Sequence, residues 1–107
     1  MSRLPLVQAT LLRRGKPVRT RTNLKKTHPY LAKYTEYPYL HAESHVVLSY
    51  GVDDCKGLDI YVTRQKKDGS FTMAKPCSVC MRILHEVGIR KVFYTNWKGK
   101  VECIRLT

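Results

Sequence analysis

The chain has 107 residues, enough for one modest hydrophobic core, so we expect a single domain over residues 1–107. No apolar run approaches the length of a membrane span, the N-terminal Met-Ser-Arg-Leu-Pro lacks the apolar core of a secretion signal, and four cysteines without such a signal do not indicate a disulfide framework, so we expect a cytoplasmic protein with no membrane partner. The 20 Lys and Arg against 8 Asp and Glu give a net charge of +12, which favours phosphate-bearing partners, although a solvated basic surface without a specific partner has the same balance.

The chain begins with a predicted β-hairpin. Residues 6–14 favour a strand, Gly15 and Lys16 favour a tight turn, and residues 17–21 return as a second strand. Pro17 stands first in that second strand, where no ladder donor is needed. Cationic residues then alternate with others over residues 18–22, which indicates one wet, basic face.

Residues 23–40 combine lysines with tyrosines. Residues 1–40 hold nine of the 20 basic residues but only one acidic residue, Glu36. Pro29 and Pro38 favour a loop with at most a short helix. Aromatic rings interleaved with lysines suit the stacking of bases from single-stranded nucleic acid, and they equally suit rings packed on the core with their hydroxyls outward, so both interpretations stay open. The tyrosines concerned are Tyr30, Tyr34, Tyr37 and Tyr39.

The rest of the chain alternates predicted helices and strands. Residues 41–50 form a helix that Gly51 stops, residues 58–63 form a half-buried strand, residues 76–87 form a second helix that Gly88 ends, and residues 91–95 form a strand. Only five residues separate this strand from the last one, at 101–106. A parallel pair needs a crossover of a dozen or more residues, so the last strand is expected to return antiparallel.

Two short segments carry the chemistry: His41-Ala42-Glu43 and Pro76-Cys77-Ser78-Val79-Cys80. Together they supply one imidazole, two thiols and one carboxylate, which is the composition of a catalytic zinc site with an open fourth position. Pro76 suits the first position of a helix, which would place Cys77 and Cys80 one turn apart near the positive end of the helix dipole. This end favours the thiolate form that binds a metal.

Three alternatives to this interpretation stay open. All four cysteines could hold a structural zinc ion, although Cys55 and Cys103 lie far from any C-x-x-C partner. His45 follows His41 by one helical turn and could compete with it as a ligand. A zinc-stabilised nucleic-acid-binding module without catalysis is also conceivable, but it would have no use for the Glu43 carboxylate.

The combination H-x-E followed by P-C-x-x-C resembles the signature of the cytidine deaminase superfamily of zinc-dependent hydrolases. Within it the chain is most similar to the deoxycytidylate (dCMP) deaminase group, because Gly88-Ile89 and Val92-Phe93-Tyr94 follow the second motif as in that group. The resemblance covers roughly residues 37–106. It implies an α/β, three-layer fold with a mixed five-stranded sheet, an antiparallel last strand and two zinc-bearing helices on one face.

The resemblance also implies roles for individual residues. His41, Cys77 and Cys80 would hold one zinc ion per chain, and Glu43 would carry protons from the attacking water to the base and the leaving amine. The backbone N–H of Ala42 would contact the base and Asn23 the sugar. Lys75 stands where relatives often have serine or glutamate, and it would place a cation near the rim of the pocket.

The implied activity is conversion of cytosine to uracil with release of ammonia. An antiparallel last strand goes mostly with relatives that act on free nucleosides and nucleotides, so the expected partner is a pyrimidine nucleotide such as dCMP. The basic first forty residues favour the alternative, a cytosine deaminase acting on single-stranded DNA or RNA. Small relatives commonly self-associate, so a homo-oligomer is expected.

Overall fold

The computed structural model describes residues 6–23 and 41–106. The predicted lysine- and tyrosine-rich loop of residues 24–40 lies outside the described residues. None of the helices within the described ranges has the length and hydrophobicity of a membrane span.

The predicted N-terminal hairpin is present. Strand β1 (Leu6–Arg13) pairs antiparallel with β2 (Lys16–Thr22). The two residues that join them, Arg14 and Gly15, have φ angles of 53° and 80°. Two consecutive positive φ angles are typical of the tight hairpin turns whose twist matches that of the flanking strands. A hydrogen bond of 2.9 Å between the hydroxyls of Thr10 and Thr20 joins the two strands at mid-length.

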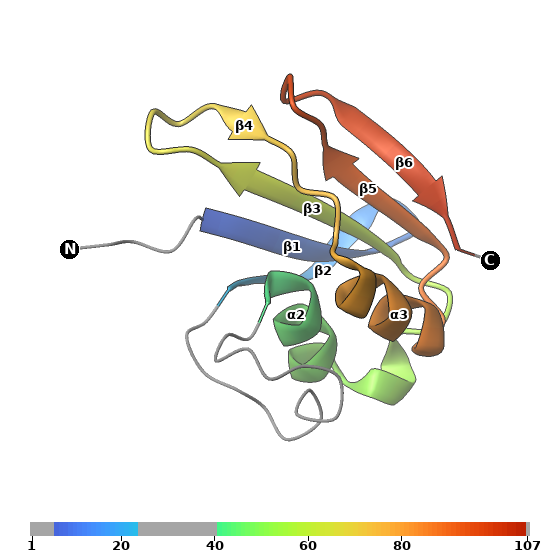
Figure 1. Ribbon diagram of the computed structural model, residues 1–107. Coiled ribbons are helices and arrows are strands. Elements are labelled where there is room, and N and C mark those ends of the chain that lie inside the picture. Colours follow the sequence, from blue (N-terminus) through green and yellow to red (C-terminus); the bar gives the residue numbers. More distant parts are fainter. Residues whose placement is uncertain (1–5, 24–40, 107) are drawn as a thin grey trace.

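The hairpin is one edge of a mixed sheet with the strand order β2-β1-β3-β5-β6 (Figure 1). Strands β3 (Asp59–Gln65) and β5 (Lys91–Thr95) are parallel neighbours, and β1 and β3 are antiparallel. Strand β6 (Val101–Arg105) pairs antiparallel with β5, as its short connection predicts. The five predicted strands therefore make up the whole path of the sheet.

The prediction of five strands is corrected by one short addition. Strand β4 (Phe71–Thr72) pairs with the end of β3 through Arg64–Thr72 and Gln65–Phe71. Two residues are too few to show an alternation of apolar and polar side chains, so nothing in the sequence distinguishes β4 from an extended loop.

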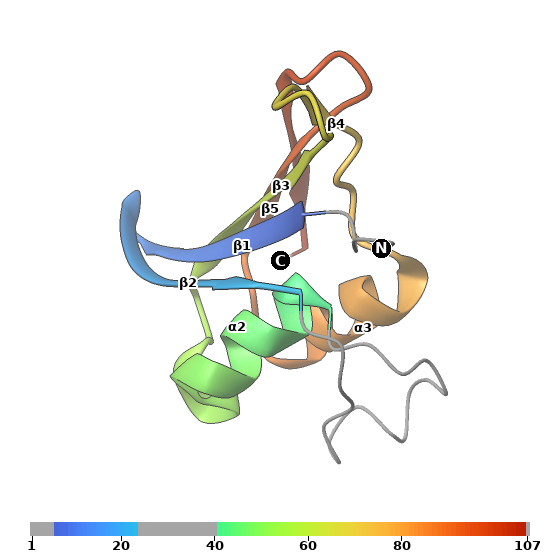
Figure 2. The same cartoon turned by 90° about the vertical axis from the view of Figure 1, so that its left-hand side faces the viewer.

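Both main helices lie on the same face of the sheet. Figure 2 shows the sheet nearly edge-on, with α2 (Ala42–Tyr50) and α3 (Ser78–Glu86) together on one side. A short 3₁₀ turn, η1 (Val52–Asp54), follows α2. The described residues thus form two layers, and the third layer of the expected fold has no helix among them.

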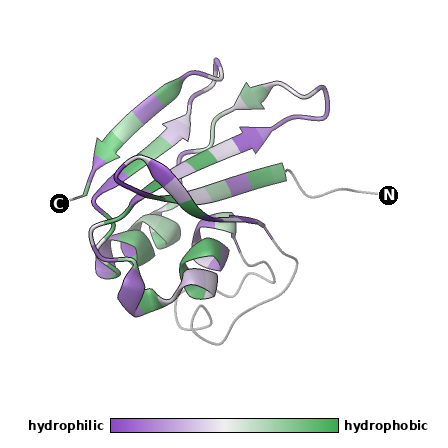
Figure 3. Cartoon of the chain, turned by 180° about the vertical axis from the view of Figure 1, so that it is seen from behind, coloured by the Kyte–Doolittle hydropathy of each residue, from purple (hydrophilic) through white to green (hydrophobic). Residues whose placement is uncertain are grey.

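The core lies between the helices and the inward face of the sheet. Hydrophobic and hydrophilic residues alternate along the strands, which gives them their banded colouring in Figure 3. The inward residues of β1 and β3, such as Leu11, Ile60 and Val62, have no solvent exposure, whereas Gln8 on the other face of β1 is exposed. The core residues are Ala9, Leu11, Ala42, Val46, Val47, Cys55, Leu58, Ile60, Val62, Ala74, Leu84, Val87, Ile89, Val92 and Tyr94.

The start and the end of α3 differ in how well the sequence predicts them. Gly88 ends the helix as expected: it has a φ of 86°, its N–H donates to the His85 carbonyl, and the Ile89 N–H donates to the Leu84 carbonyl. The expected start at Pro76 is wrong. The helix begins at Ser78 with Cys77 as its N-cap, so Pro76 precedes the cap.

Candidate metal centre

The two motifs meet at the N-terminal ends of the two helices. His41 is the N-cap of α2 and Cys77 is the N-cap of α3, and both have extended backbone conformations. Neither side chain makes the usual capping hydrogen bond to its own helix. The imidazole and the thiol are therefore directed away from their own helices and toward each other.

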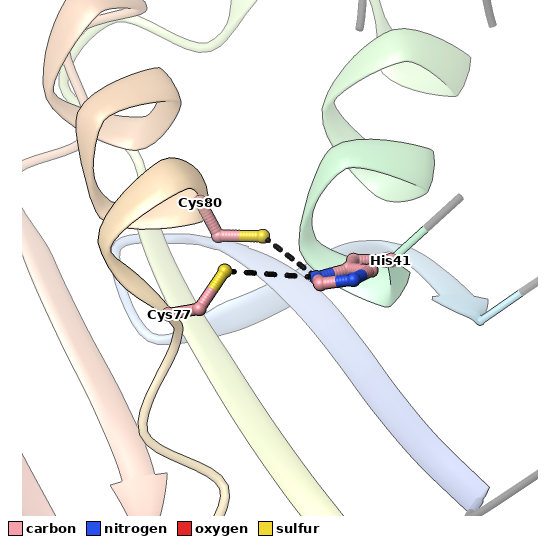
Figure 4. A group of neighbouring side chains, drawn as sticks. All are labelled: His41, Cys77 and Cys80. Atoms are coloured by element: carbon pink, nitrogen blue, oxygen red, sulfur yellow. Dashed lines mark hydrogen bonds between the residues drawn. The ribbon is translucent and has the colours of Figure 1, made fainter. Parts of the chain in front are cut away.

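One nitrogen and two sulfur atoms converge at this point (Figure 4). Nδ1 of His41 lies 3.2 Å from Sγ of Cys80 and 3.8 Å from Sγ of Cys77. The ligand atoms of the three residues all lie within 4.8 Å of one another. A tetrahedral zinc ion with bonds of about 2.3 Å to sulfur and about 2.0–2.1 Å to nitrogen separates such atoms by about 3.5–3.8 Å. In both atom type and spacing, the three side chains fit zinc with one coordination position left open.

The hydrogen bonds within this cluster shift the pKa values of its three side chains. Hydrogen bonds from Cys80 and His41 lower the pKa of Cys77 to about 3, which makes it a thiolate. The hydrogen bond to Cys77 raises the pKa of His41, while the hydrogen bond to Cys77, together with burial, raises the pKa of Cys80. Thiolate and neutral imidazole are the forms that bind a metal, so a divalent cation would displace any proton that these groups carry.

Glu43 lies beside this group without being part of it. The cluster of potential ligands found within the described ranges consists of His41, Cys77 and Cys80 alone. Glu43 is only 5% exposed, and this burial raises the pKa of its carboxyl group. Because of its raised pKa, this carboxyl group takes up a proton more readily than usual. A carboxyl group of this kind beside a metal site is suited to transfer protons.

A cavity of about 330 Å³ opens in front of the cluster. Its volume is within the usual range of small-molecule sites. It includes every candidate site residue of the sequence analysis except the buried Cys80. The lining residues are Val7, Asn23, His41, Ala42, Glu43, Arg64, Met73, Ala74, Lys75 and Cys77.

Asn23 is held in the cavity wall by the neighbouring strand. Its side-chain Oδ1 accepts a hydrogen bond of 3.2 Å from the Val7 N–H, and its own N–H donates to the Val7 carbonyl at 3.2 Å. The preceding residue, Thr22, has its carbonyl 2.7 Å from Nδ1 of His45. His45 is therefore bound to the end of β2 and does not compete with His41 for the metal position.

The opposite wall is fixed by the end of β5. The Ala74 N–H donates to the Thr95 carbonyl at 2.8 Å, and the buried Thr95 hydroxyl donates to the Thr72 carbonyl at 2.6 Å. These two hydrogen bonds attach the segment between β4 and α3 to the sheet. They hold Lys75 and Cys77 at the cavity.

The remaining cysteines rule out a four-cysteine zinc site in the part of the chain that the structure describes. Cys55 is buried, and its thiol lies 3.3 Å from the Gly51 carbonyl. Cys103 is exposed on β6. Neither belongs to the cluster formed by the other two cysteines.

The sequence analysis missed one functional candidate, Arg64. This residue lies on β3 and lines the same cavity as Lys75. Its neighbours in the sequence carry no motif. The sequence offered one signal, an interruption of the apolar alternation along this strand. After Ile60 and Val62, the next residue on the same face is an arginine.

Comparison with known proteins gives matches only in structure. No protein-family model and no curated protein sequence matches the chain. The crystal structure of a cytidine deaminase from Burkholderia pseudomallei matches with a TM-score of 0.65 and 20% identity, covering 95% of this chain and 76% of that one.

Two crystal structures of a dCMP deaminase from the cyanophage S-TIM5, one in apo form and one in complex with dCMP and dUMP, each match with a TM-score of 0.58. The identities are 20% and 19%, with 85% of this chain covered in both cases. The chain spans about two thirds of the length of these phage chains, 66% and 65% respectively. With its mixed sheet, its antiparallel last strand and two helices whose N-terminal ends meet at a His-Cys-Cys cluster, the chain has the cytidine deaminase fold.

Proposed function

We infer that the chain is a zinc-dependent hydrolase that deaminates cytosine to uracil on a free pyrimidine nucleotide such as dCMP. The observation that carries this proposal is the position of Glu43, a buried carboxyl group outside the cluster of potential zinc ligands that lines the same cavity as two of them, His41 and Cys77. A purely structural metal site has no need of such a group or of such a cavity. The fold supports the same reaction class, because the crystal structures that share it are those of a dCMP deaminase and a cytidine deaminase.

In this proposal His41, Cys77 and Cys80 hold the metal. Bound zinc would supply an activated water molecule as the nucleophile. During the addition of water to the amino-bearing carbon of the cytosine ring, Glu43 would accept one proton of the water and deliver it to the ring nitrogen. Glu43 then transfers the second proton of the water to the departing amino group. The C–N bond breaks, ammonia leaves and uracil remains, so atoms and protons balance.

The other candidate residues orient the base and the sugar. Ala42 is the first residue of α2, and a backbone N–H at this position has no partner within its helix. It lines the cavity next to Glu43, where it can donate to a carbonyl oxygen of the base. Asn23, fixed to β1 through its Oδ1, contacts the sugar.

The choice of a free nucleotide rests on the last strand and on the cavity. The antiparallel pairing of β5 with β6 is the arrangement expected of deaminases that act on free nucleosides and nucleotides. The phage dCMP deaminase with the same fold was crystallised with dCMP and dUMP. The second candidate, a deaminase of single-stranded DNA or RNA, is favoured by the basic residues among positions 1–40.

A comparison of substrates tests the proposal. The purified protein, whose zinc content should be about one ion per chain, is incubated with dCMP, with cytidine and with a cytosine-containing oligonucleotide, and the products are separated by chromatography. We expect dUMP from dCMP as the main product, and we expect chelation to stop the reaction until zinc is restored. Conversion of the oligonucleotide without turnover of dCMP would favour the second candidate. A zinc-loaded protein that converts none of the three would refute the proposed reaction.

The salt dependence gives a second test of the substrate class. Binding to a strand weakens with salt by a logarithmic slope of about 0.7 per phosphate contacted. A free nucleotide brings only one phosphate group, so turnover of dCMP should depend only weakly on salt. A separate measurement, the molar mass by size-exclusion chromatography with light scattering, tests the expected homo-oligomer.

A further inference from the structure

An arginine stands at a core-facing position of β3. The inward residues of this strand are Ile60 and Val62, both without solvent exposure, and the next in the alternation is Arg64. The register confirms the face: Val62 pairs with the buried Ala9 of β1, and Arg64 pairs with Val7 two residues further. The helices cover the rows of Ile60 and Val62, whereas the row of Arg64 lines the cavity.

The charges that line this cavity are few and unequal. Arg64 and Lys75 are exposed cations, and Glu43 is the one carboxyl group among the described lining residues. Because Glu43 is buried and the two cations are exposed, the positive charge lies toward the mouth of the cavity. A nucleotide that enters the cavity with its base toward Glu43 therefore has its anionic group near these cations.

Two other arginines of the described part are already engaged. Arg90 forms a bidentate ion pair with Asp59 at 3.0–3.1 Å, and Arg19 donates to the Ser49 carbonyl at 3.1 Å. Among the described residues, Arg64 and Lys75 have no hydrogen-bond or ion-pair partner. No residue of the described ranges therefore competes with a ligand in the cavity for their donors.

We propose that Arg64 selects substrates that carry a 5′-phosphate, with Lys75 as the second cation of the same subsite. The inference rests on the proposed function, which places the base beside Glu43 and the sugar beside Asn23. The 5′ side of the nucleotide is then directed toward the exposed end of the cavity. A guanidinium group binds two phosphate oxygens at once, whereas the Lys75 ammonium group acts as a point charge.

The test compares dCMP with deoxycytidine, which differ only by the phosphate. The variants are Arg64→Gln, which removes the charge, and Arg64→Lys, which keeps the charge but cannot bind two phosphate oxygens as a guanidinium group does. The matched control is Lys67→Gln, because Lys67 is an exposed cation of the turn between β3 and β4 that does not line the cavity. The measured quantity is the ratio of kcat/KM for dCMP to that for deoxycytidine.

We expect Arg64→Gln to lower this ratio by roughly 10- to 150-fold, the effect of losing a hydrogen bond to a charged group. Arg64→Lys should recover part of the loss, and Lys67→Gln should leave the ratio within about threefold of wild type. A ratio that Arg64→Gln changes no more than the control does would overturn the phosphate subsite. Wild-type turnover of both substrates would in that case still support the proposed function.

Binding separates the subsite from the reaction. Calorimetric titration of the zinc-loaded protein with dUMP should show affinity that Arg64→Gln weakens and that Lys67→Gln does not. If this holds in a protein without deaminase activity, the phosphate subsite stands and the proposed function fails. If Arg64→Gln leaves dUMP binding unchanged, the subsite is refuted whatever the activity. If the variant impairs turnover of the oligonucleotide and not of dCMP, Arg64 serves a strand phosphate, and selection of the monophosphate is refuted.

Discussion

Replacement of Glu43 by glutamine separates proton transfer from metal binding. The substitution keeps the size of the side chain and removes its ability to accept a proton. Glu43 lies outside the His41-Cys77-Cys80 cluster, so zinc content should stay near one ion per chain. A positioned general acid–base group contributes about 10²- to 10⁴-fold to a rate, which is about 2.7–5.5 kcal/mol of transition-state stabilisation. Because Glu43 would move two protons in each turnover, we expect a loss of kcat at the upper end of this range.

The assay measures kcat from dUMP formation and zinc content by mass spectrometry on the same preparations. The matched control is Asp53→Asn, which removes an exposed carboxylate of η1 outside the cavity and should leave both quantities unchanged. Loss of zinc in the Glu43→Gln variant would make Glu43 a ligand and refute its assignment as a proton carrier. A kcat within tenfold of wild type at normal zinc content would refute it as well.

Three further predictions concern the metal and the stability of the fold. Cys77→Ala and Cys80→Ala should each lose zinc and lower the melting temperature, because the metal binds the folded state, whereas Cys103→Ala should keep its zinc; normal zinc in both of the first two variants would contradict the site. Gly88→Ala should lower the free energy of unfolding by about 1–2 kcal/mol in urea denaturation, because Gly88 has a φ of 86° and a Cβ there would lie 3.0 Å from Cγ of Lys56; an unchanged midpoint would contradict this. Burial raises the pKa of the Cys55 thiol from 9.0 to about 11, so the folded chain keeps a proton that the unfolded chain loses as the pH rises through this window. This group's contribution is therefore complete below pH 9.0 and falls by about 1.4 kcal/mol per pH unit up to about pH 11, so the free energy of unfolding measured in urea should fall more steeply over this window in wild type than in Cys55→Ala.

The elements with strong local signals were predictable from the sequence. The alternation of apolar residues predicted β3, and the short connection between β5 and β6 predicted their antiparallel pairing. Gly88 predicted the end of α3, where the structure shows it with a positive φ angle. The metal cluster was predictable too, because residue types and spacing define it without knowledge of the sheet. The start of α3 was not, since the residue that caps the helix is Cys77, which contributes its thiol to the cluster and makes no capping hydrogen bond.

The parts that escaped prediction depend on contacts between distant segments. Strand β4 exists only because the end of β3 is available to pair with it. Arg64 becomes a cavity residue only because the helix layer stops before its row of the sheet, and no local pattern encodes where that layer ends. The role of Asn23 is implied only by the family resemblance, and the structure adds the hydrogen bonds to Val7 that fix its orientation.

The two capping residues His41 and Cys77 have a consequence for how the chain holds itself together. They are 36 positions apart, and the four cysteines of the chain form no disulfide. An ion bound between them would act as a reversible cross-link that closes this loop. Closing a loop of that length removes about 4 kcal/mol of chain entropy from the unfolded state, which is comparable to a substantial part of the stability of a small domain. The same ion would also connect the segments that bear Glu43 and Lys75. The geometry of the cavity and the stability of the folded chain would then depend on the same metal–ligand bonds.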